Sequence, residues 1–190
     1  MTEAWRDKLR ARAFTALTKK AAFGNDIDLS DFVAEGAASG EISEEIRKRS
    51  LEVGVDVSQQ KGGTYFQLDH SVLLSQLASK VQGLELISID LALQKYDWLK
   101  DYYWKAVSVE ADKYTAIAEL KQTKGYFIRS APHEKIEMPV QACLYMESEG
   151  ILQAPHNVII AEEGSELNVI TGCTVGTKVK RAAHLGISEF

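Results

Sequence analysis

The sequence has few of the features that mark several common protein classes. Among its 190 residues it holds only two cysteines, Cys143 and Cys173, and three prolines. Two cysteines about thirty positions apart fit neither a zinc-site spacing nor a disulfide framework. No apolar run approaches the roughly 18 residues that a membrane-spanning helix requires, and residues 1–12 lack the apolar core of a signal peptide. These absences predict a cytoplasmic protein without a membrane segment and with reduced thiols.

Basic residues are also in deficit. Lysine and arginine number 22 against 27 aspartates and glutamates, which gives a formal net charge of −5. Broad nucleic-acid binding needs a basic surface that neutralises phosphates, so the charge argues against a nucleic-acid partner. The composition, 45% hydrophobic and 26% charged, is typical of a globular protein. The length fits one large domain or two small ones.

Motifs for nucleotide hydrolysis and nucleophilic catalysis are missing as well. The sequence has no Walker A pattern, no glycine-rich dinucleotide loop and no Gly-x-Ser-x-Gly elbow. ATP hydrolysis would therefore have to come from a partner. Glu162 and Glu163 are adjacent and precede the turn at Gly164, so they do not form the pair of carboxylates, about 5–9 Å apart across a cleft, that a glycosidase uses.

The first part of the chain is predicted to be mainly helical. An amphipathic helix over 2–23 carries basic residues outside its apolar stripe, and Ser43 is placed as the N-cap of a second, short helix. The glycine- and alanine-rich stretch 36–40 between them is typical of a flexible connector. The elements predicted after it are the Ser43-capped helix to about Val53, a strand over Thr64–Leu68, a helix from Asp69 or Ser71 to about Lys80, a strand over Leu84–Ile87 and a helix from Leu91 to about Lys105.

From about residue 115 the pattern changes to short strands separated by glycine, proline and acidic turns. Their spacing is typical of a sandwich, a barrel or a β-solenoid, although no strict six-residue repeat is present. We expect a mainly helical region over 1–110 and the start of a β-rich core, incomplete at its end, over 111–190. The predicted strands are Tyr126–Arg129, Val140–Glu147, Val158–Ala161, Leu167–Thr171 and a last one within His184–Phe190.

Five segments, in order, resemble the SufB/SufD family of iron–sulfur cluster assembly scaffolds. Upstream stretches that include the aromatic run Tyr96–Trp104 look like the short SufB-like proteins of archaea and anaerobic bacteria, so the resemblance covers roughly 50–190. The five segments are Gly125–Arg129, Met138–Gln141, Ile159–Ser165, Thr171–Thr174 and His184–Phe190.

This resemblance implies an α+β fold, in which a helical N-terminal region precedes the first rungs of a right-handed parallel β-helix (a β-solenoid). It implies a scaffold without enzyme activity of its own, working with a SufC-type ABC ATPase, a second SufB/SufD-like subunit and a sulfur donor. An iron–sulfur cluster would be built transiently in the intact protein. The later part of the family's β-helix is missing from the sequence, so we expect a chain truncated at its C-terminus that retains no cluster by itself.

The resemblance also singles out three residues. Cys173 matches the cysteine of the family's Gly-Cys-Ser/Thr corner, which is a candidate for receiving or passing sulfur, and nearby basic residues such as Lys178 and Arg181 could favour its thiolate. His184 and Glu189 lie on the family's histidine-containing segment and are possible iron ligands. Free cysteines are often small buried residues without reactivity, which is the alternative for Cys173 and the preferred interpretation of Cys143.

Two other classes of function stay open at this point. One is a β-solenoid enzyme for acyl transfer or carbohydrate chemistry, and the other is a protein-binding adaptor that docks a partner on the aromatic helix 91–105. The remaining histidines, His70, His133 and His156, have no ligand-type neighbours at short spacing and are predicted to lie in turns or on the surface.

Overall fold

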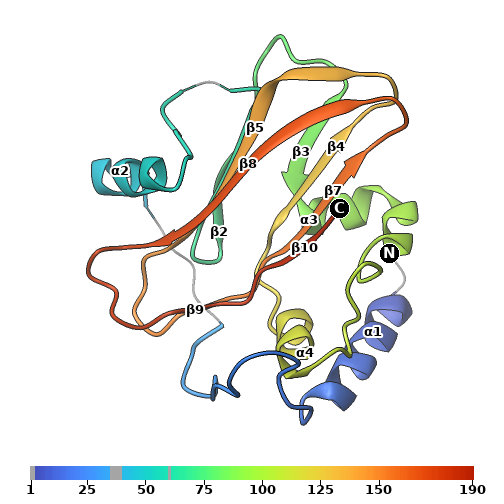
Figure 1. Cartoon of the computed structure of the whole chain (residues 1–190), viewed down its shortest axis with the longest axis vertical. Helices are drawn as coiled ribbons and strands as arrows, with labels where there is room; N and C mark the ends of the chain where they lie inside the picture. The colour runs from blue at the N-terminus through green and yellow to red at the C-terminus, as the bar shows by residue number, and fades with distance from the viewer. Residues whose placement is uncertain (1–2, 35–39, 60) are drawn as a thin grey trace.

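A computed structural model describes residues 3–34, 40–59 and 61–190, and in it two four-stranded sheets face each other beside a group of helices (Figure 1). The strand order is β2-β1-β5-β8 in one sheet and β10-β7-β4-β3 in the other, and β6 pairs with β9. The helical elements are α1 (Glu3–Ala16), α2 (Glu44–Glu52), α3 (Ile89–Lys95), the 3-10 helix η1 (Asp97–Asp101) and α4 (Lys113–Leu120). The strands are β1 (Gly63–Leu68), β2 (Ser71–Leu77), β3 (Leu84–Ser88), β4 (Tyr126–Ser130), β5 (Lys135–Met146), β6 (Leu152–Gln153), β7 (His156–Ala161), β8 (Glu166–Val175), β9 (Ala183–His184) and β10 (Ile187–Glu189).

The sheets are mixed, and this corrects the expected right-handed parallel β-helix. Parallel pairs do form: β5 lies between β1 and β8, β7 lies between β4 and β10, and paired residues such as Gln153 and His184 are 31 positions apart. Both sheets, however, also contain an antiparallel pair, β1 with β2 and β3 with β4. The division predicted at residue 110 stays a prediction, and β1 pairs across it with β5.

The predicted helix over 69–80 is wrong, because the chain reverses at Asp69 and continues as strand β2. Asp69 has a left-handed backbone (φ 50°), and its carboxylate accepts hydrogen bonds from Glu147 N at 2.7 Å and from Ser148 Oγ at 2.6 Å. This anchored two-residue turn sets β2 antiparallel to β1. Pairing with a buried neighbour strand thus outweighs the helical pattern of the isolated segment.

The helix predicted from Leu91 to about Lys105 is also too long. Helix α3 ends at Lys95, η1 follows, and Trp104 has a left-handed backbone (φ 58°) that no helix accommodates. Helix α1 stops at Ala16, short of the predicted end at residue 23. Residues 36–39 of the predicted connector lie outside the described residues, as does residue 2 of the first predicted helix.

Other predicted elements are confirmed. The Ser43 side chain accepts a hydrogen bond from Ile46 N and caps α2. The strands predicted at 64–68 and 84–87 correspond to β1 and β3, and those of the second half are found as β4, β5, β7 and β8. The last predicted strand is divided into β9 and β10.

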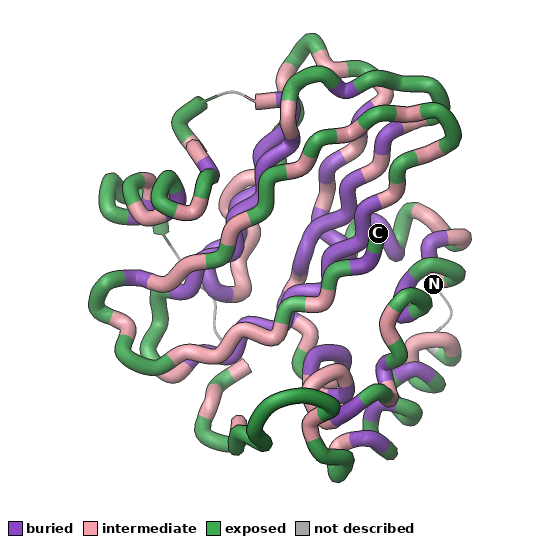
Figure 2. Tube along the Cα trace, in the orientation of Figure 1, coloured by how far each residue is buried: buried purple, intermediate pink, exposed green. Residues whose placement is uncertain are grey.

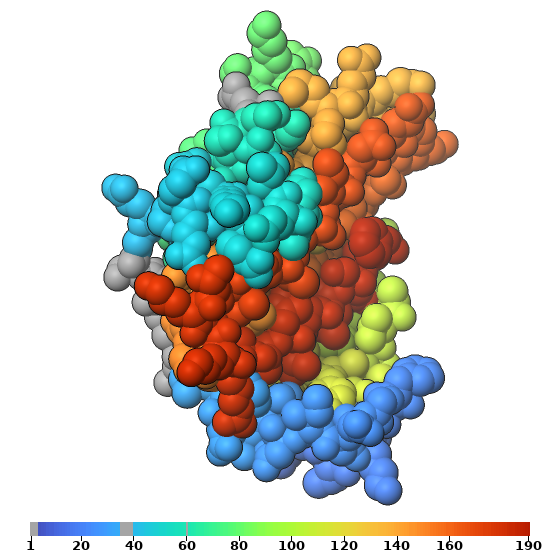
Figure 3. All heavy atoms as spheres, turned by 60° about the vertical axis from the view of Figure 1, so that its left-hand side comes forward, coloured from blue at the N-terminus to red at the C-terminus, as the bar shows by residue number. Residues whose placement is uncertain are grey.

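The buried side chains form three clusters that follow the alternation of the strands. Figure 2 marks where the buried residues lie along the chain. On β5, Val140, Ala142 and Leu144 point between the sheets, whereas Cys143 and Tyr145 point to the outer side under α2. On β4, Phe127 points away from the other sheet, toward α1, α3 and α4. In Figure 3 the segment containing α2 lies over the outer side of β8. Helices therefore cover the outer side of each sheet.

Within the described ranges, no helix combines the length and the apolar character needed to cross a membrane.

Candidate functional site

A cavity of about 350 Å³ lies between β8 and β10, each of which is an edge strand of its sheet. Cys173 lines it from β8, and His184 lines it from β9. Two residues that sequence analysis singled out, separated by a loop, thus share one cavity. The other lining residues are Tyr126, Leu144, Asn157, Thr171, Gly172, Gly186 and Ser188.

Cys173 faces this cavity because of the alternation along β8. Its neighbour Gly172 packs on the opposite side of the sheet, where an added Cβ would lie 2.7 Å from the Val53 side chain. Thr171 and Cys173 therefore point between the sheets, and Cys173 is exposed because no strand of the described chain covers the open edge of β8. Arg181, one of the predicted basic neighbours, packs its guanidinium over Phe32, 4.5 Å from the ring centroid, and is engaged there.

His184 is held by a buried glutamine. Its Nδ1 lies 3.0 Å from Gln153 Oε1, and burial lowers the pKa of His184. Gln153 Nε2 donates to the carbonyls of Asp69, at 2.8 Å, and Tyr145, at 3.2 Å. Gln153 therefore orients the imidazole of His184, and the two backbone carbonyls in turn orient the amide group of Gln153.

The walls of the cavity are joined by polar side chains. Asn157 accepts a hydrogen bond from Tyr126 N at 3.1 Å and donates to Ser188 Oγ at 3.1 Å, so it ties β4, β7 and β10 together. Burial raises the pKa of Tyr126 to about 12, although side-chain hydrogen bonds with Ser188 and Thr171 act in the opposite direction. The cavity is thus lined by neutral hydrogen-bonding groups around one thiol and one imidazole.

Glu189, the third predicted residue, does not lie in this cavity. Its side chain is 3% exposed, and one carboxylate oxygen accepts hydrogen bonds from His156 Nε2 at 2.6 Å and Trp104 N at 2.7 Å. The other oxygen accepts from the backbone amides of Lys105, Ala106 and Val107 at 2.7–3.3 Å. Burial raises the pKa of Glu189, but the bonds to His156 and the backbone outweigh it, and the net shift is downward. Glu189 thus anchors β10 to the segment 104–107.

Sequence analysis missed the importance of His156, and the prediction of a turn or surface position is wrong. The ring is buried, stacked on Tyr103 at 4.0 Å and in edge contact with Trp104 at 4.7 Å. Burial lowers the pKa of His156, so the neutral ring donates through Nε2 to Glu189. The available signal was its place at the start of a strand of apolar residues, directly before Asn157 and Val158.

Cys143 is chemically different from Cys173. It is fully buried, its Sγ lies 3.6 Å from Ser50 Oγ, and burial raises the pKa of its thiol to about 11. The thiolate form of Cys143 is therefore disfavoured at pH 8, and the buried sulfur is shielded from solvent.

This contrast predicts selective alkylation. Iodoacetamide at pH 8 should add one adduct to the folded chain, at Cys173, and two to the urea-unfolded chain, as read by intact mass. The Cys173→Ser chain should then gain no adduct when folded, and Cys143→Ser should still gain one. Equal labelling of both thiols in the folded chain would contradict the assignment.

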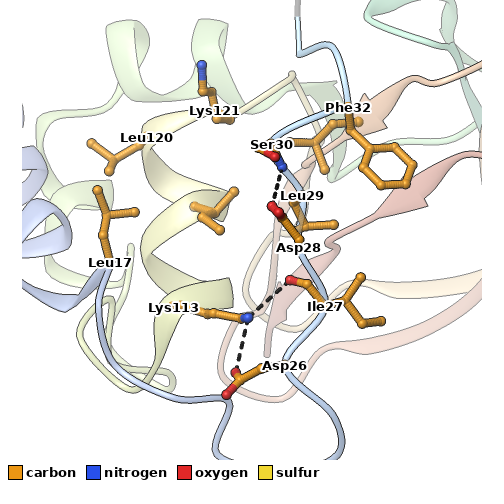
Figure 4. Close-up of a pocket in the computed structure, with 12 residues that line it drawn as sticks. Leu17, Asp26, Ile27, Asp28, Leu29, Ser30, Phe32, Lys113, Leu120 and Lys121 are labelled. Atoms are coloured by element: carbon orange, nitrogen blue, oxygen red, sulfur yellow. Dashed lines mark hydrogen bonds and ion pairs between the residues drawn. The ribbon is translucent and has the colours of Figure 1, made fainter.

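Two larger cavities flank the segment 26–32. One, of about 600 Å³, lies between this segment and α4, where Lys113 binds Asp26 at 3.1 Å and the Ile27 carbonyl at 3.0 Å (Figure 4). Neither cysteine nor histidine lines it. The other, of about 680 Å³, lies on the far side of the segment and shares His184 and Gly186 with the Cys173 cavity. His184 thus lines both this cavity and the Cys173 cavity.

No family model matches the chain. Curated relatives do match it: the chain is 43% identical over 197 aligned positions to an iron–sulfur cluster assembly SufBD family protein of Methanothermobacter thermautotrophicus, covering 97% of this chain and 47% of that protein. The chain belongs to the SufBD family. A family protein of Archaeoglobus fulgidus is 44% identical over 158 positions, 82% of this chain and 42% of its own length, and one of Staphylococcus haemolyticus is 27% identical over 155 positions, 79% and 33%. This SufBD-family chain therefore spans about half the length of the M. thermautotrophicus relative.

Proposed function

We propose that this SufBD-family chain is the sulfur-receiving part of a cytoplasmic scaffold for iron–sulfur cluster assembly, with Cys173 as the acceptor thiol. The observation that carries the proposal is the exposed Cys173 thiol on the edge strand β8, beside a polar cavity. The relatives' names as iron–sulfur cluster assembly proteins supply the context.

The proposed step is a thiol–persulfide exchange. The Cys173 thiolate attacks the outer sulfur of a donor persulfide, so a new S–S bond forms at Cys173. The donor's own S–S bond breaks, and the donor leaves as a thiolate. The outer sulfur keeps its oxidation state, so the exchange needs no external oxidant or reductant. The cavity beside Cys173 offers room for the added sulfur.

The partners in this proposal are a SufC-type ABC ATPase, a second SufB/SufD-like subunit and a sulfur donor. They are supported by family membership alone, and the chain's lack of a Walker A motif agrees with an ATPase supplied in trans. The cluster would be cargo, built in the intact protein. Co-purification of the full-length protein with the ATPase tests this part of the proposal.

The two other classes left open by the sequence gain no support from the structure. Glu162 of the adjacent carboxylates pairs with Arg129 at 2.8 Å. The aromatic segment proposed as an adaptor surface packs Tyr103 and Trp104 inward, where each is at most 6% exposed, and leaves Leu91 and Tyr102 about half exposed at separate positions.

The proposed function predicts sulfur transfer to one cysteine. Incubated anaerobically with glutathione persulfide, the chain should gain the mass of one sulfur atom, and dithiothreitol should remove it. Cys173→Ser should abolish the gain, because Cys143 is buried with a raised pKa. The matched variant Cys143→Ser should keep it.

A Cys173→Ser chain that still gains sulfur, or a wild-type chain that gains none, would contradict the proposal. Circular dichroism of each variant checks that the fold is retained.

A further inference from the structure

Cys173 and His184 bring a thiol and an imidazole to the same cavity from separate strands. These are the two side chains that bind borderline-soft metal ions most readily. Among the residues that the structure describes, no group of three or more histidine, cysteine, aspartate or glutamate side chains could hold a metal ion. A metal in this cavity would therefore take at most two ligands of these types from the described residues.

The hydrogen bonds around His184 decide which ring nitrogen is available. Gln153 Nε2 donates to the Asp69 and Tyr145 carbonyls, so Gln153 presents its Oε1, an acceptor, to the imidazole. Nδ1 of His184, 3.0 Å from that oxygen, must then carry the proton. The neutral ring is left with its lone pair on Nε2, which is the arrangement of a metal-binding histidine oriented by a second residue.

The space next to Nε2 is kept open by a glycine. A Cβ added to Gly186 would lie 2.7 Å from His184 Nε2, closer than real contacts allow. Gly186 and His184 both line the cavity that Cys173 lines. A side chain at position 186 would therefore displace the imidazole or cover the nitrogen that carries the lone pair.

We propose that this cavity is a two-point binding site for a thiophilic divalent metal ion, held by Cys173 Sγ and His184 Nε2. On binding, the Cys173 thiol loses its proton to solvent, and water keeps the remaining coordination positions. Two protein ligands leave the remaining coordination positions to water, which makes the ion exchangeable, so the site would receive a metal and release it. That the ion in use is Fe²⁺ delivered for a cluster rests on the proposed function, whereas metal binding as such does not.

The test is an anaerobic titration of the chain with Co²⁺, followed by the thiolate-to-cobalt charge-transfer absorption. Wild type and the matched control Cys143→Ser should give the same saturable band, and Cys173→Ser should give none. His184→Gln and Gly186→Ala should each weaken Co²⁺ affinity at least about tenfold, the first by removing the nitrogen and the second by covering it. Circular dichroism confirms that each variant is folded.

Two outcomes would overturn the site: no saturable band in wild type, or a band of unchanged affinity in both His184→Gln and Gly186→Ala. The persulfide assay on the same wild-type preparation separates this inference from the proposed function. A chain that gains sulfur but shows no saturable band rejects the metal site alone. A chain that binds Co²⁺ through both residues but gains no sulfur rejects sulfur acceptance alone.

Discussion

Replacing Glu189 by alanine should lower the free energy of unfolding by roughly 3 kcal/mol, because it removes a carboxylate that accepts several hydrogen bonds and each buried donor left without an acceptor costs about 1–3 kcal/mol. The substitution leaves two buried donors, His156 Nε2 and Trp104 N, without their acceptor, and it also frees the half-buried backbone amides of 105–107. Urea unfolding followed by tryptophan fluorescence measures the change, because Trp104 lies in the affected segment.

The damage should extend beyond β10. Trp104 Nε1 donates at 2.8 Å to Glu119, a second buried carboxylate, whose pKa burial raises. Tyr103 and Trp104 also enclose the ring of His156. Loss of Glu189 thus loosens the contact between the last strand and the helical side of the molecule, and Ile187–Glu189 should lose hydrogen-exchange protection together with 104–107.

Two further variants make this prediction sharp. Glu189→Gln keeps an acceptor oxygen at nearly the same volume and should lose clearly less stability than Glu189→Ala. Glu166→Ala removes a carboxylate from an ion pair with Lys135 whose side chains are both about two-thirds exposed, so no measurable change is expected. If Glu189→Ala were as stable as Glu166→Ala, the anchoring role would be wrong.

The strands of the second half could be predicted because their signals are local. Pro139 precedes β5's buried part, and alternate residues from Val140 to Tyr145 divide between the two sides of the sheet, as the period of two requires. The turn into β2 could not be predicted, because Asp69 is held in place by Glu147 and Ser148, far along the chain.

The candidate site shows the same limit. The family resemblance indicated Cys173, His184 and Glu189. The sequence does not show which of these three side chains lie close together in the folded chain. Cys173 and His184 meet because parallel pairing brings β8 beside β5 and β9 beside β6. Glu189 instead accepts hydrogen bonds from backbone amides of the segment 104–107, where Trp104 has a left-handed backbone conformation. The direction in which a backbone amide points depends on the folded backbone, so it could not be predicted from the residue types.

Gly125→Ala should destabilise the chain by at least about 3 kcal/mol, because two penalties coincide there. Gly125 has a backbone φ of 110°, which residues with a side chain rarely adopt. An added Cβ would also overlap the carbonyl oxygen of His156 and lie 2.6 Å from the carbonyl carbon. Backbone atoms of β7 cannot give way without disturbing the bond between His156 and Glu189. Gly125 O also accepts hydrogen bonds from Tyr65 OH at 2.9 Å and Ile89 N at 3.0 Å, so the glycine itself cannot shift freely.

A glycine series separates these two penalties. Gly150 also has a positive φ (72°), but no atom lies within 4 Å of an added Cβ. Gly150→Ala should therefore lower the free energy of unfolding only by the backbone strain, about 1–2 kcal/mol. Gly40→Ala meets neither penalty and should leave stability unchanged or slightly raised, because alanine restricts the unfolded chain. Chemical denaturation of the three variants should rank them 125, 150, 40 in order of loss. Equal losses at 125 and 150 would mean that β7 yields to the added methyl group, and that the close packing of Gly125 on His156 does not fix the position of the ring that binds Glu189.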